Sequence, residues 1–337
     1  MEETKQSLEQ QLDIHRQNLN WLEEQRARHG LDAPLHILHG IEYEKQEIKR
    51  LTELLKANSY ITEADVLLRM AIDLAIAGGR IVLDYYQRNL RQITDVSMKH
   101  ITTEADERAE ERIINGIRAK FGQEHAIIAE EKRGTTDTAK EKGITWVVDG
   151  LDGSINFHCG VPLFCTAIGI LKDRKPYIGV IYEPVRRELY YAQEGDRAYL
   201  EHLDIGLKEE IRTSPVEELD EAVVMTHLTS RRTKREKMTY SGLLDAVANA
   251  TRHIRMLGSG QLALTYVARG RFQAFLNNYT YPWDQVAGKV ILEAAGGKVT
   301  DFGGKEWTIE SESILACNNE RLHIGLFALI EGLYPKA

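Results

Sequence analysis

Apolar residues recur along one side of two helices predicted in the first 57 residues. In the first helix they are Leu8, Leu12, Leu19 and Leu22. In the second they are Leu38, Ile41, Ile48, Leu51 and Leu55. Steps of three, four and seven positions keep such residues on one helical stripe, and between the two runs Gly30 suits a helix end while Pro34 suits a helix start. The pattern predicts a helical hairpin over residues 3–57, which we treat as a domain of residues 1–57.

The predicted stripe is narrow, as in a coiled coil. Two thin helices offer little surface, so we expect the stripe to pack on another copy of the chain, on the remaining domain or on a foreign protein. We therefore predict an interaction or oligomerisation role for the hairpin. The chain would then be a homodimer or higher oligomer, or the hairpin would bind a protein partner.

From residue 60 onward the pattern is typical of an α/β domain. Helices are predicted around 66–82 and over 103–121, and the short apolar runs 126–129 and 144–148 each end in acidic residues. Residues 164–200 contain three or four strands joined by short polar turns. The remaining predicted elements are a strand at 222–226, helices at 234–249, 261–269 and 284–295, a strand at 272–276 and further strand within 298–317.

Charge and composition narrow the classes of partner. The chain has 337 residues with 51 acidic and 43 basic side chains, a net charge of −8, which disfavours general binding to nucleic acid or anionic lipid. No stretch reaches the roughly 20 apolar residues needed to span a bilayer, and the first residues are polar and acidic. We therefore expect a cytoplasmic protein without nucleic acid or membrane among its partners. Cys159, Cys165 and Cys317 form no CxxC or zinc-like spacing, so disulfides and structural zinc are not expected.

Carboxylates follow apolar runs or open a predicted helix in three separate segments. They are Glu130, Glu131, Asp149, Asp152 and Asp284. Ligand crevices in α/β folds form at the carboxyl ends of strands, and carboxylates gathered there repel one another unless cations lie between them. Oxygen ligands without His or Cys favour Mg²⁺ or Mn²⁺ over zinc. Each residue alone also has a structural interpretation, with Glu130 and Glu131 in a solvated loop and Asp284 as the N-cap of the next helix.

Residues 146–157 combine two carboxylates, a hydroxyl and an amide. A strand delivers Asp149, a tight turn supplies Asp152, and Gly153 with Ser154 opens a helix whose first N–H groups face the same place. This arrangement predicts a phosphate site beside a metal site. An ordinary Asp-Gly turn is the alternative, but it does not account for the other polar residues.

Three motifs resemble signatures of the inositol monophosphatase family. DGLDGSINF (149–157) resembles D-P-I/L-D-G-T/S-x-N-F, and YPWDQVAG (281–288) with EAAGG (293–297) looks like the second signature, W-D-x-A-A-G…E-A-G-G. IAEE (128–131) is similar to the G-E-E segment of the family. The motifs occur in family order and the resemblance extends from residue 60 to about residue 335, so we assign residues 60–337 to a catalytic domain of this type.

The resemblance implies an α/β (α+β) fold, a layered αβαβα sandwich that uses Mg²⁺ to hydrolyse a small phosphate monoester. It implies two or three Mg²⁺ ions, with Mn²⁺ as an alternative, held by Glu130, Asp149, the backbone carbonyl of Leu151, Asp152 and Asp284. The implied catalytic residues are Asp106, Glu131 and Ser154, with Ser154 and Asp106 orienting the attacking water. The implied substrate contacts are Asp152, Gly153, Ser154, Gly260 and Asn277, with Lys99 as the lysine of a mobile loop. Asp106 also fits a capping box with Thr103, and both roles are compatible.

The chain departs from the family pattern at three positions. Gly150 replaces the usual proline after the first Asp, so we expect a looser turn. Asn277 stands where inositol-specific members have a Glu, and Gly260 stands where they have an Ala that lines the substrate site. The resemblance therefore supports the metal site more strongly than it supports any one alcohol as the substrate.

The predicted function is Mg²⁺-dependent hydrolysis of inositol monophosphate or a related sugar phosphate by activated water. Relatives that act on histidinol phosphate, fructose 1,6-bisphosphate or 3′-phosphonucleotides are alternatives within the same superfamily. A regulatory or scaffold protein that acts through its hairpin is an alternative of another class. Because every acidic position of the implied site is filled, an inert fold is disfavoured. The resemblance also implies inhibition by lithium.

Overall fold

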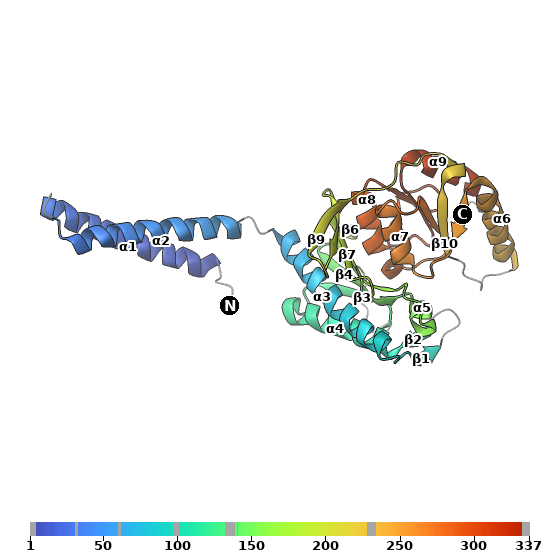
Figure 1. Ribbon diagram of the computed structural model, residues 1–337, viewed down its shortest axis with the longest axis horizontal. Coiled ribbons are helices and arrows are strands. Elements are labelled where there is room, and N and C mark those ends of the chain that lie inside the picture. Colours follow the sequence, from blue (N-terminus) through green and yellow to red (C-terminus); the bar gives the residue numbers. More distant parts are fainter. Residues whose placement is uncertain are drawn as a thin grey trace. The chain divides into compact units, whose positions relative to one another are not determined.

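The computed structural model describes residues 5–30, 33–59, 62–96, 101–131, 139, 141–227 and 234–331. For residues 5–11, 35–36, 54–59 and 234–240 it describes the backbone alone. The chain divides into two compact units, residues 1–67 and 68–337 (Figure 1). No helix in the described part of the chain combines the length and the apolar composition that a membrane span requires.

The first unit contains the helical hairpin, made of α1 (Lys5–His29) and α2 (Leu35–Ser59). Helix α1 ends before Gly30, whose φ is +61°. The carbonyl oxygen of Pro34 accepts hydrogen bonds from the N–H groups of Ile37 and Leu38, at 2.9 and 3.4 Å, so α2 begins directly after the proline. The helix ends predicted at Gly30 and Pro34 are confirmed.

The hairpin buries part of its apolar stripe. Leu12 and Leu51 pack together and are 7% and 0% exposed, and Ile37 and Ile41 are 5% and 4% exposed. Ile37 takes the place in the stripe that the pattern assigned to Leu38, which is 38% exposed. Other stripe residues are only partly buried, namely Leu19, Leu22 and Ile48, so packing of the stripe on a further surface stays a prediction.

A polar layer interrupts this stripe. Glu44 is buried, its Oε2 lies 2.5 Å from His15 Nδ1, and its Oε1 accepts a hydrogen bond from Asn18 Nδ2 at 3.3 Å. Polar groups at such a position favour one register between two helices over shifted ones, because a shift would bury them unpaired. The side chains of Leu8 and Leu55 lie outside the described residues.

The second unit contains a seven-stranded sheet in the order β3-β4-β5-β6-β7-β8-β9. The strands are β3 (Ala126–Ala129), β4 (Ile144–Asp152), β5 (Cys165–Lys172), β6 (Lys175–Glu183), β7 (Glu188–Gln193), β8 (Ala198–His202) and β9 (Leu207–Ile211). β3 runs parallel to β4, and every later neighbouring pair is antiparallel. The carboxyl ends of β3 and β4 therefore meet at one edge of the sheet.

A second sheet has five strands in the order β11-β10-β12-β14-β13. They are β10 (Val223–His227), β11 (His253–Arg255), β12 (Ala274–Asn277), β13 (Lys298–Thr300) and β14 (Ile314–Cys317). β10 is parallel to β11 and β12, whereas β14 is antiparallel to β12 and β13. A separate antiparallel ribbon joins β1 (Ile93–Val96) to β2 (Ile101–Thr103).

Helices cover both sheets and fill the space between them (Figure 1). They are α3 (Glu63–Gln87), α4 (Glu104–Phe121), α5 (Ser154–Cys159), α6 (Lys234–Ala250), α7 (Gly260–Ala268), α8 (Val286–Ala294) and α9 (Glu320–Glu331), with 3₁₀ turns at Leu219–Glu221 and Pro282–Asp284. α4 packs on β4, α7 and α8 lie between the sheets against β6 and β12, and α9 packs on β14. This order of layers confirms the predicted αβαβα sandwich, and all of α7 and the first seven residues of α8 are buried.

Gly150 allows α4 to approach β4 at contact distance. A methyl group on Gly150 would lie 2.9 Å from the backbone oxygen of Asp106 and 2.9 Å from the backbone nitrogen of Glu110. Both atoms belong to the helix backbone, so relieving the clash would move the whole helix. The turn that we expected to be looser without its proline is therefore tightly packed.

Gly150→Ala is expected to lower the free energy of unfolding by about 1–3 kcal/mol, because the added methyl group overpacks the contact between β4 and α4. Gly260→Ala is the matched control, since its methyl group would meet no atom closer than 3.5 Å. Alanine also favours the helical conformation over glycine by about 1 kcal/mol, so the control should be as stable as the wild type or more so. Urea denaturation measures both values, and equal stability of the two variants would contradict this account.

Candidate active site

Three chain segments bring the predicted acidic residues to one edge of the seven-stranded sheet. β3 ends immediately before Glu130, and its parallel neighbour β4 carries Asp149 and Asp152. The 3₁₀ turn that ends at Asp284 lies more than 130 residues later in the sequence, and it contacts β4. Glu130, Asp152 and Asp284 line a single cavity of about 180 Å³. The juxtaposition expected from the strand ends is present.

Asp149 is the most enclosed of these carboxylates. It is 1% exposed, and its Oδ1 accepts a hydrogen bond from the N–H of Leu151 at 3.0 Å. Its Oδ2 is buried and has no hydrogen-bond partner among the described residues. Burial raises the pKa of Asp149 well above its usual range, and the negative charges of Glu130, Asp152 and Asp284 raise it further.

Asp152 is held by the beginning of α7. Its Oδ2 accepts hydrogen bonds from Ser259 Oγ at 2.5 Å and from the backbone N–H of Gln261 at 2.8 Å. Its Oδ1 accepts a longer one, 3.3 Å, from the backbone N–H of Gly260. Burial raises the pKa of Asp152, and these hydrogen bonds oppose that rise because they favour the charged form.

Asp284 is not the N-cap of the following helix, which was the structural interpretation of this residue. It is the last residue of the 3₁₀ turn, and its Oδ2 accepts a hydrogen bond from the N–H of Tyr281 at 2.9 Å. Pro282 occupies the first position of the turn, where a missing N–H costs nothing. Helix α8 consequently begins at Val286, two residues later than predicted.

The donor atoms fit a hard divalent cation. All of them are oxygens, Oδ2 of Asp149 lacks a hydrogen-bond partner among the described residues, and the acids raise one another's pKa by charge repulsion. As the side chains lie, no three His, Cys, Asp or Glu residues in the described ranges converge closely enough to share an ion. A bound cation would offset the repulsion between these carboxylates.

Asp106 and Ser154 form the hydrogen-bonded pair that the resemblance implies. Ser154 Oγ lies 2.8 Å from Asp106 Oδ1 and 3.0 Å from the carbonyl oxygen of Leu151, so its proton has two acceptors. Asp106 Oδ2 accepts hydrogen bonds from the Thr103 backbone N–H at 2.8 Å and from its Oγ1 at 2.5 Å. Asp106 thus completes the capping box of α4 and faces Ser154 at the same time. Burial raises its pKa to about 7, although these hydrogen bonds favour the charged form.

Glu131 lies beside this cavity and does not line it. Its Oε2 accepts a hydrogen bond from Thr102 Oγ1 at 2.7 Å, and its N–H donates to Glu110 Oε2 at 2.8 Å. It borders a separate acidic depression with Thr102 and Glu110. Burial raises the pKa of Glu130, and the charge of Glu131 raises it further; the catalytic role implied for Glu131 stays a prediction.

Asn277 lines the opposite part of the cavity with a defined amide orientation. Its Oδ1 accepts a hydrogen bond from the backbone N–H of Tyr279 at 3.1 Å. Because a backbone N–H can only donate, Nδ2 is the other end of this amide. Gly260 borders the same cavity, as do Gly153 and Ser154 at the start of α5.

Sequence reasoning missed several residues of the cavity wall. They are Ile101, His227, Gly258, Tyr279 and Tyr281. The hydroxyls of Tyr279 and Tyr281 lie 2.8 Å apart, and the Tyr281 ring stacks on that of Trp283 with 4.8 Å between centroids. Tyr279 lies between Asn277 and the second motif, and Tyr281 is the first residue of that motif, so their places in the sequence were a signal for them. Lys99 lies outside the described residues, so its role stays a prediction.

Comparison with known proteins gives one consistent result for the second unit. The model of the inositol monophosphatase family matches residues 63–333. Inositol monophosphatase 3 of Solanum lycopersicum is 31% identical over 255 residues, which cover 74% of this chain and 91% of the relative. The fructose-1,6-bisphosphatase/inositol-1-monophosphatase of Thermotoga maritima is 33% identical over 242 residues, covering 71% and 86%.

Solved structures agree with these sequence matches. The crystal structure of the extragenic suppressor protein suhB from Bartonella henselae superposes with a TM-score of 0.71 at 27% identity. The superposition covers 79% of this chain and 98% of that chain. The family match begins at residue 63, so α1 and α2 lie outside it.

Proposed function

This chain belongs to the inositol monophosphatase family and is a phosphomonoester hydrolase, and we propose that it uses Mg²⁺ to hydrolyse inositol monophosphate or a related sugar phosphate. Buried carboxylates alone would repel an anionic phosphate ester. The proposal is carried by the unpartnered Oδ2 of Asp149, which is surrounded by the charges of Glu130, Asp152 and Asp284 and needs a cation to compensate it.

The residues that would hold the metal are those that the motifs imply. They are Glu130, Asp149, the carbonyl of Leu151, Asp152 and Asp284, for two or three Mg²⁺ ions or Mn²⁺ in their place. When bound, these cations supply positive charge to the phosphate oxygens and lower the pKa of water. Asp152 is already oriented for this role by Ser259 and the first turn of α7.

Ser154 and Asp106 would orient the attacking water. When the Ser154 hydroxyl donates a hydrogen bond to Asp106, its oxygen keeps lone pairs that would accept a hydrogen bond from the attacking water. Thr103 fixes the other oxygen of Asp106, so the carboxylate cannot rotate away from the serine. The N–H groups of Gly153 and Ser154 would hold the phosphate, since backbone donors at a helix start favour anions.

Asp149→Asn tests the metal site. The substitution removes one charge from the centre of the cluster, so phosphate release should fall by several orders of magnitude. In the absence of divalent metal the variant should be at least as stable to heat as the wild type, because the empty site is a source of repulsion. Phosphate release and thermal denaturation measure the two effects. Wild-type turnover that persists in excess EDTA would refute the proposal, and insensitivity to lithium would count against the inositol branch.

We expect Asn277 to make the cavity's selection among substrate alcohols weak and to favour alcohols with hydrogen-bond acceptor groups. Because Oδ1 is engaged by Tyr279, Nδ2 offers donor hydrogens to the cavity, which suit acceptor groups of the substrate. Inositol hydroxyls both donate and accept, so they gain no special preference here. The relative from Thermotoga maritima carries both inositol-1-monophosphatase and fructose-1,6-bisphosphatase in its name, and we propose a similarly broad selection among sugar phosphates.

Asn277→Asp is expected to favour inositol 1-phosphate over fructose 1,6-bisphosphate. The carboxylate accepts hydrogen bonds from hydroxyls and repels the second phosphate, so the ratio of the two kcat/KM values should shift by about 10- to 100-fold. In the wild type the same ratio should stay below about a thousandfold, since one or two polar contacts supply only about 1–3 kcal/mol. Steady-state kinetics on both substrates measure the ratios. A larger wild-type preference would show that other residues select the alcohol.

We propose an interaction or oligomerisation role for residues 1–57, because the hairpin leaves apolar side chains partly or largely exposed. Trp21 and Ile14, seven residues apart on α1, are 60% and 56% exposed and offer apolar contact area there. A chain that begins at Ser59 retains the whole region matched by the family model. Its turnover number should stay within a few-fold of the full chain, while its oligomeric state changes or a partner is lost. Kinetics and light scattering measure both, and a folded, inactive truncated protein would contradict this division.

A further inference from the structure

Gln261 connects two of the carboxylate-bearing segments. It is the second residue of α7 and is 1% exposed. Its backbone N–H donates to Asp152 Oδ2 at 2.8 Å. Its side chain reaches in the other direction, toward the chain around Asp284.

Both ends of the Gln261 amide are hydrogen-bonded to backbone. Nε2 donates to the carbonyl oxygen of Trp283 at 2.6 Å, and Oε1 accepts from the N–H of Gly288 at 2.8 Å. A carbonyl only accepts and a backbone N–H only donates, so the amide has one orientation. Trp283 immediately precedes Asp284, and Gly288 lies in the first turn of α8.

We propose that Gln261 is a positioning residue that sets the placement of Asp152 relative to Asp284 for metal binding. The inference rests on the proposed function, in which both carboxylates hold Mg²⁺. A single side chain ties the first turn of α7 to the 3₁₀ turn and to α8, and the backbone of the same residue holds Asp152. Groups that orient metal ligands without touching the metal typically account for 10- to 100-fold in metal affinity.

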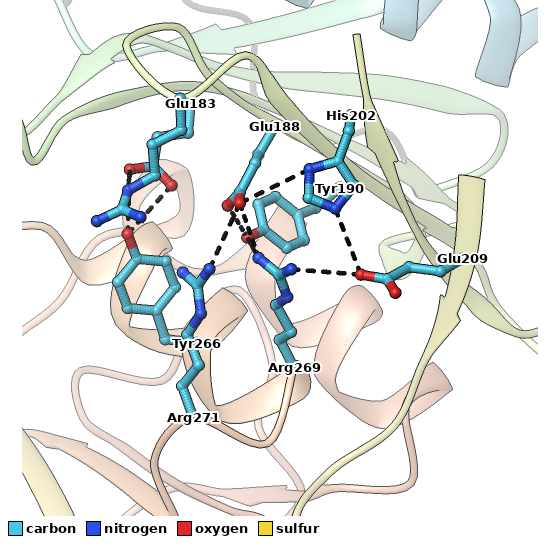
Figure 2. Close-up of polar contacts among 9 residues, drawn as sticks. Glu183, Glu188, Tyr190, His202, Glu209, Tyr266, Arg269 and Arg271 are labelled. Carbon is cyan, nitrogen blue, oxygen red and sulfur yellow. Dashed lines mark hydrogen bonds and ion pairs between the residues drawn. The ribbon is translucent and has the colours of Figure 1, made fainter. Parts of the chain in front are cut away.

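The far end of α7 is anchored, so the helix cannot shift to compensate for a lost contact. Arg269 caps the helix and its Nη1 donates to Glu188 Oε1 at 2.8 Å, while its Nη2 lies 3.3 Å from Glu209. Tyr266, one turn earlier, donates to Glu183 (Figure 2). Figure 2 shows these side chains converging from α7 and from the strands of the seven-stranded sheet.

Glu188 is the centre of this anchor. Burial opposes its ionisation, but hydrogen bonds from Tyr190 and Arg269 and the charge of Arg271 outweigh burial and lower its pKa. The ion pairs therefore persist at neutral pH. One end of α7 is thus fixed to the sheet, and the bonds of Gln261 and Ser259 connect its other end to Asp152 and to the segment around Asp284.

Gln285 provides a matched control. It is 0% exposed and lies next to Asp284, yet neither Nε2 nor Oε1 of its amide has a hydrogen-bond partner among the described residues. Replacing either glutamine by methionine removes a buried amide group and leaves a side chain of similar size. Only the change at Gln261 breaks bonds between the two segments.

The experiment titrates the full-length wild type, Gln261→Met and Gln285→Met with Mn²⁺, following the free ion by electron paramagnetic resonance. Thermal denaturation of metal-free protein accompanies each titration. We expect Gln261→Met to bind Mn²⁺ at least about tenfold more weakly, and Gln285→Met to bind within about threefold of the wild type. If Gln261→Met does not fold, Gln261→Ala takes its place, because alanine is the strongest helix former and removes the same two bonds.

The outcomes separate this inference from the function on which it rests. Wild type that binds no Mn²⁺ would overturn the proposed function and the inference together. Wild-type affinity in Gln261→Met with a lower melting temperature would overturn the inference alone, because a merely structural residue changes stability without changing metal affinity. Equal weakening in both methionine variants would also overturn it.

Discussion

Repulsion among buried carboxylates is the constraint on which the rest of the catalytic unit depends. Asp149 is 1% exposed, and the charges of its acidic neighbours add to the cost of burying it. Such a cluster is unfavourable in a folded protein without a cation. Its retention therefore requires a rigid surrounding structure that keeps the side chains together, and two devices around the cavity provide it.

The first device uses backbone donors and short hydrogen-bonded contacts. The start of α7 directs N–H groups and the Ser259 hydroxyl at Asp152, and the start of α4 directs those of Thr103 at Asp106. Both carboxylates are thus oriented before any ligand arrives, which is the form of preorganisation that active sites require. The second device is close packing, since Gly150 brings the backbone of α4 against the strand that carries Asp149.

The N-terminal hairpin obeys a separate set of constraints. α1 and α2 bury part of their apolar stripe between them, including Leu12 and Leu51, and Glu44 with His15 and Asn18 adds a polar layer that favours one register. It forms its own compact unit and lies outside the region matched by the family model. Trp21 of this pair is largely exposed, in keeping with the interaction role that we propose for the hairpin.

The sequence by itself determined the features that depend on neighbours along the chain. Gly30 and Pro34 marked the ends of the hairpin helices, and apolar runs ending in acids predicted that Glu130 and Asp149 would meet at one sheet edge. The pairing of Ser154 with Asp106 followed from the motifs, because a motif records contacts that a family shares. The sequence pattern did not predict some short or polar elements. One is β9, whose exposed Lys and Glu residues show no apolar alternation.

Only the tertiary structure decided what depends on residues distant in sequence. The tight packing of Gly150 depends on α4, and Glu131 accepts a hydrogen bond from Thr102, 29 residues earlier. Gln261 reads in the sequence as one more residue of an apolar helix. Its connection of Asp152 to the turn before Asp284 arises from the packing of α7 between two sheets, since hydrogen-bond partners more than 20 and 100 residues away leave no local pattern.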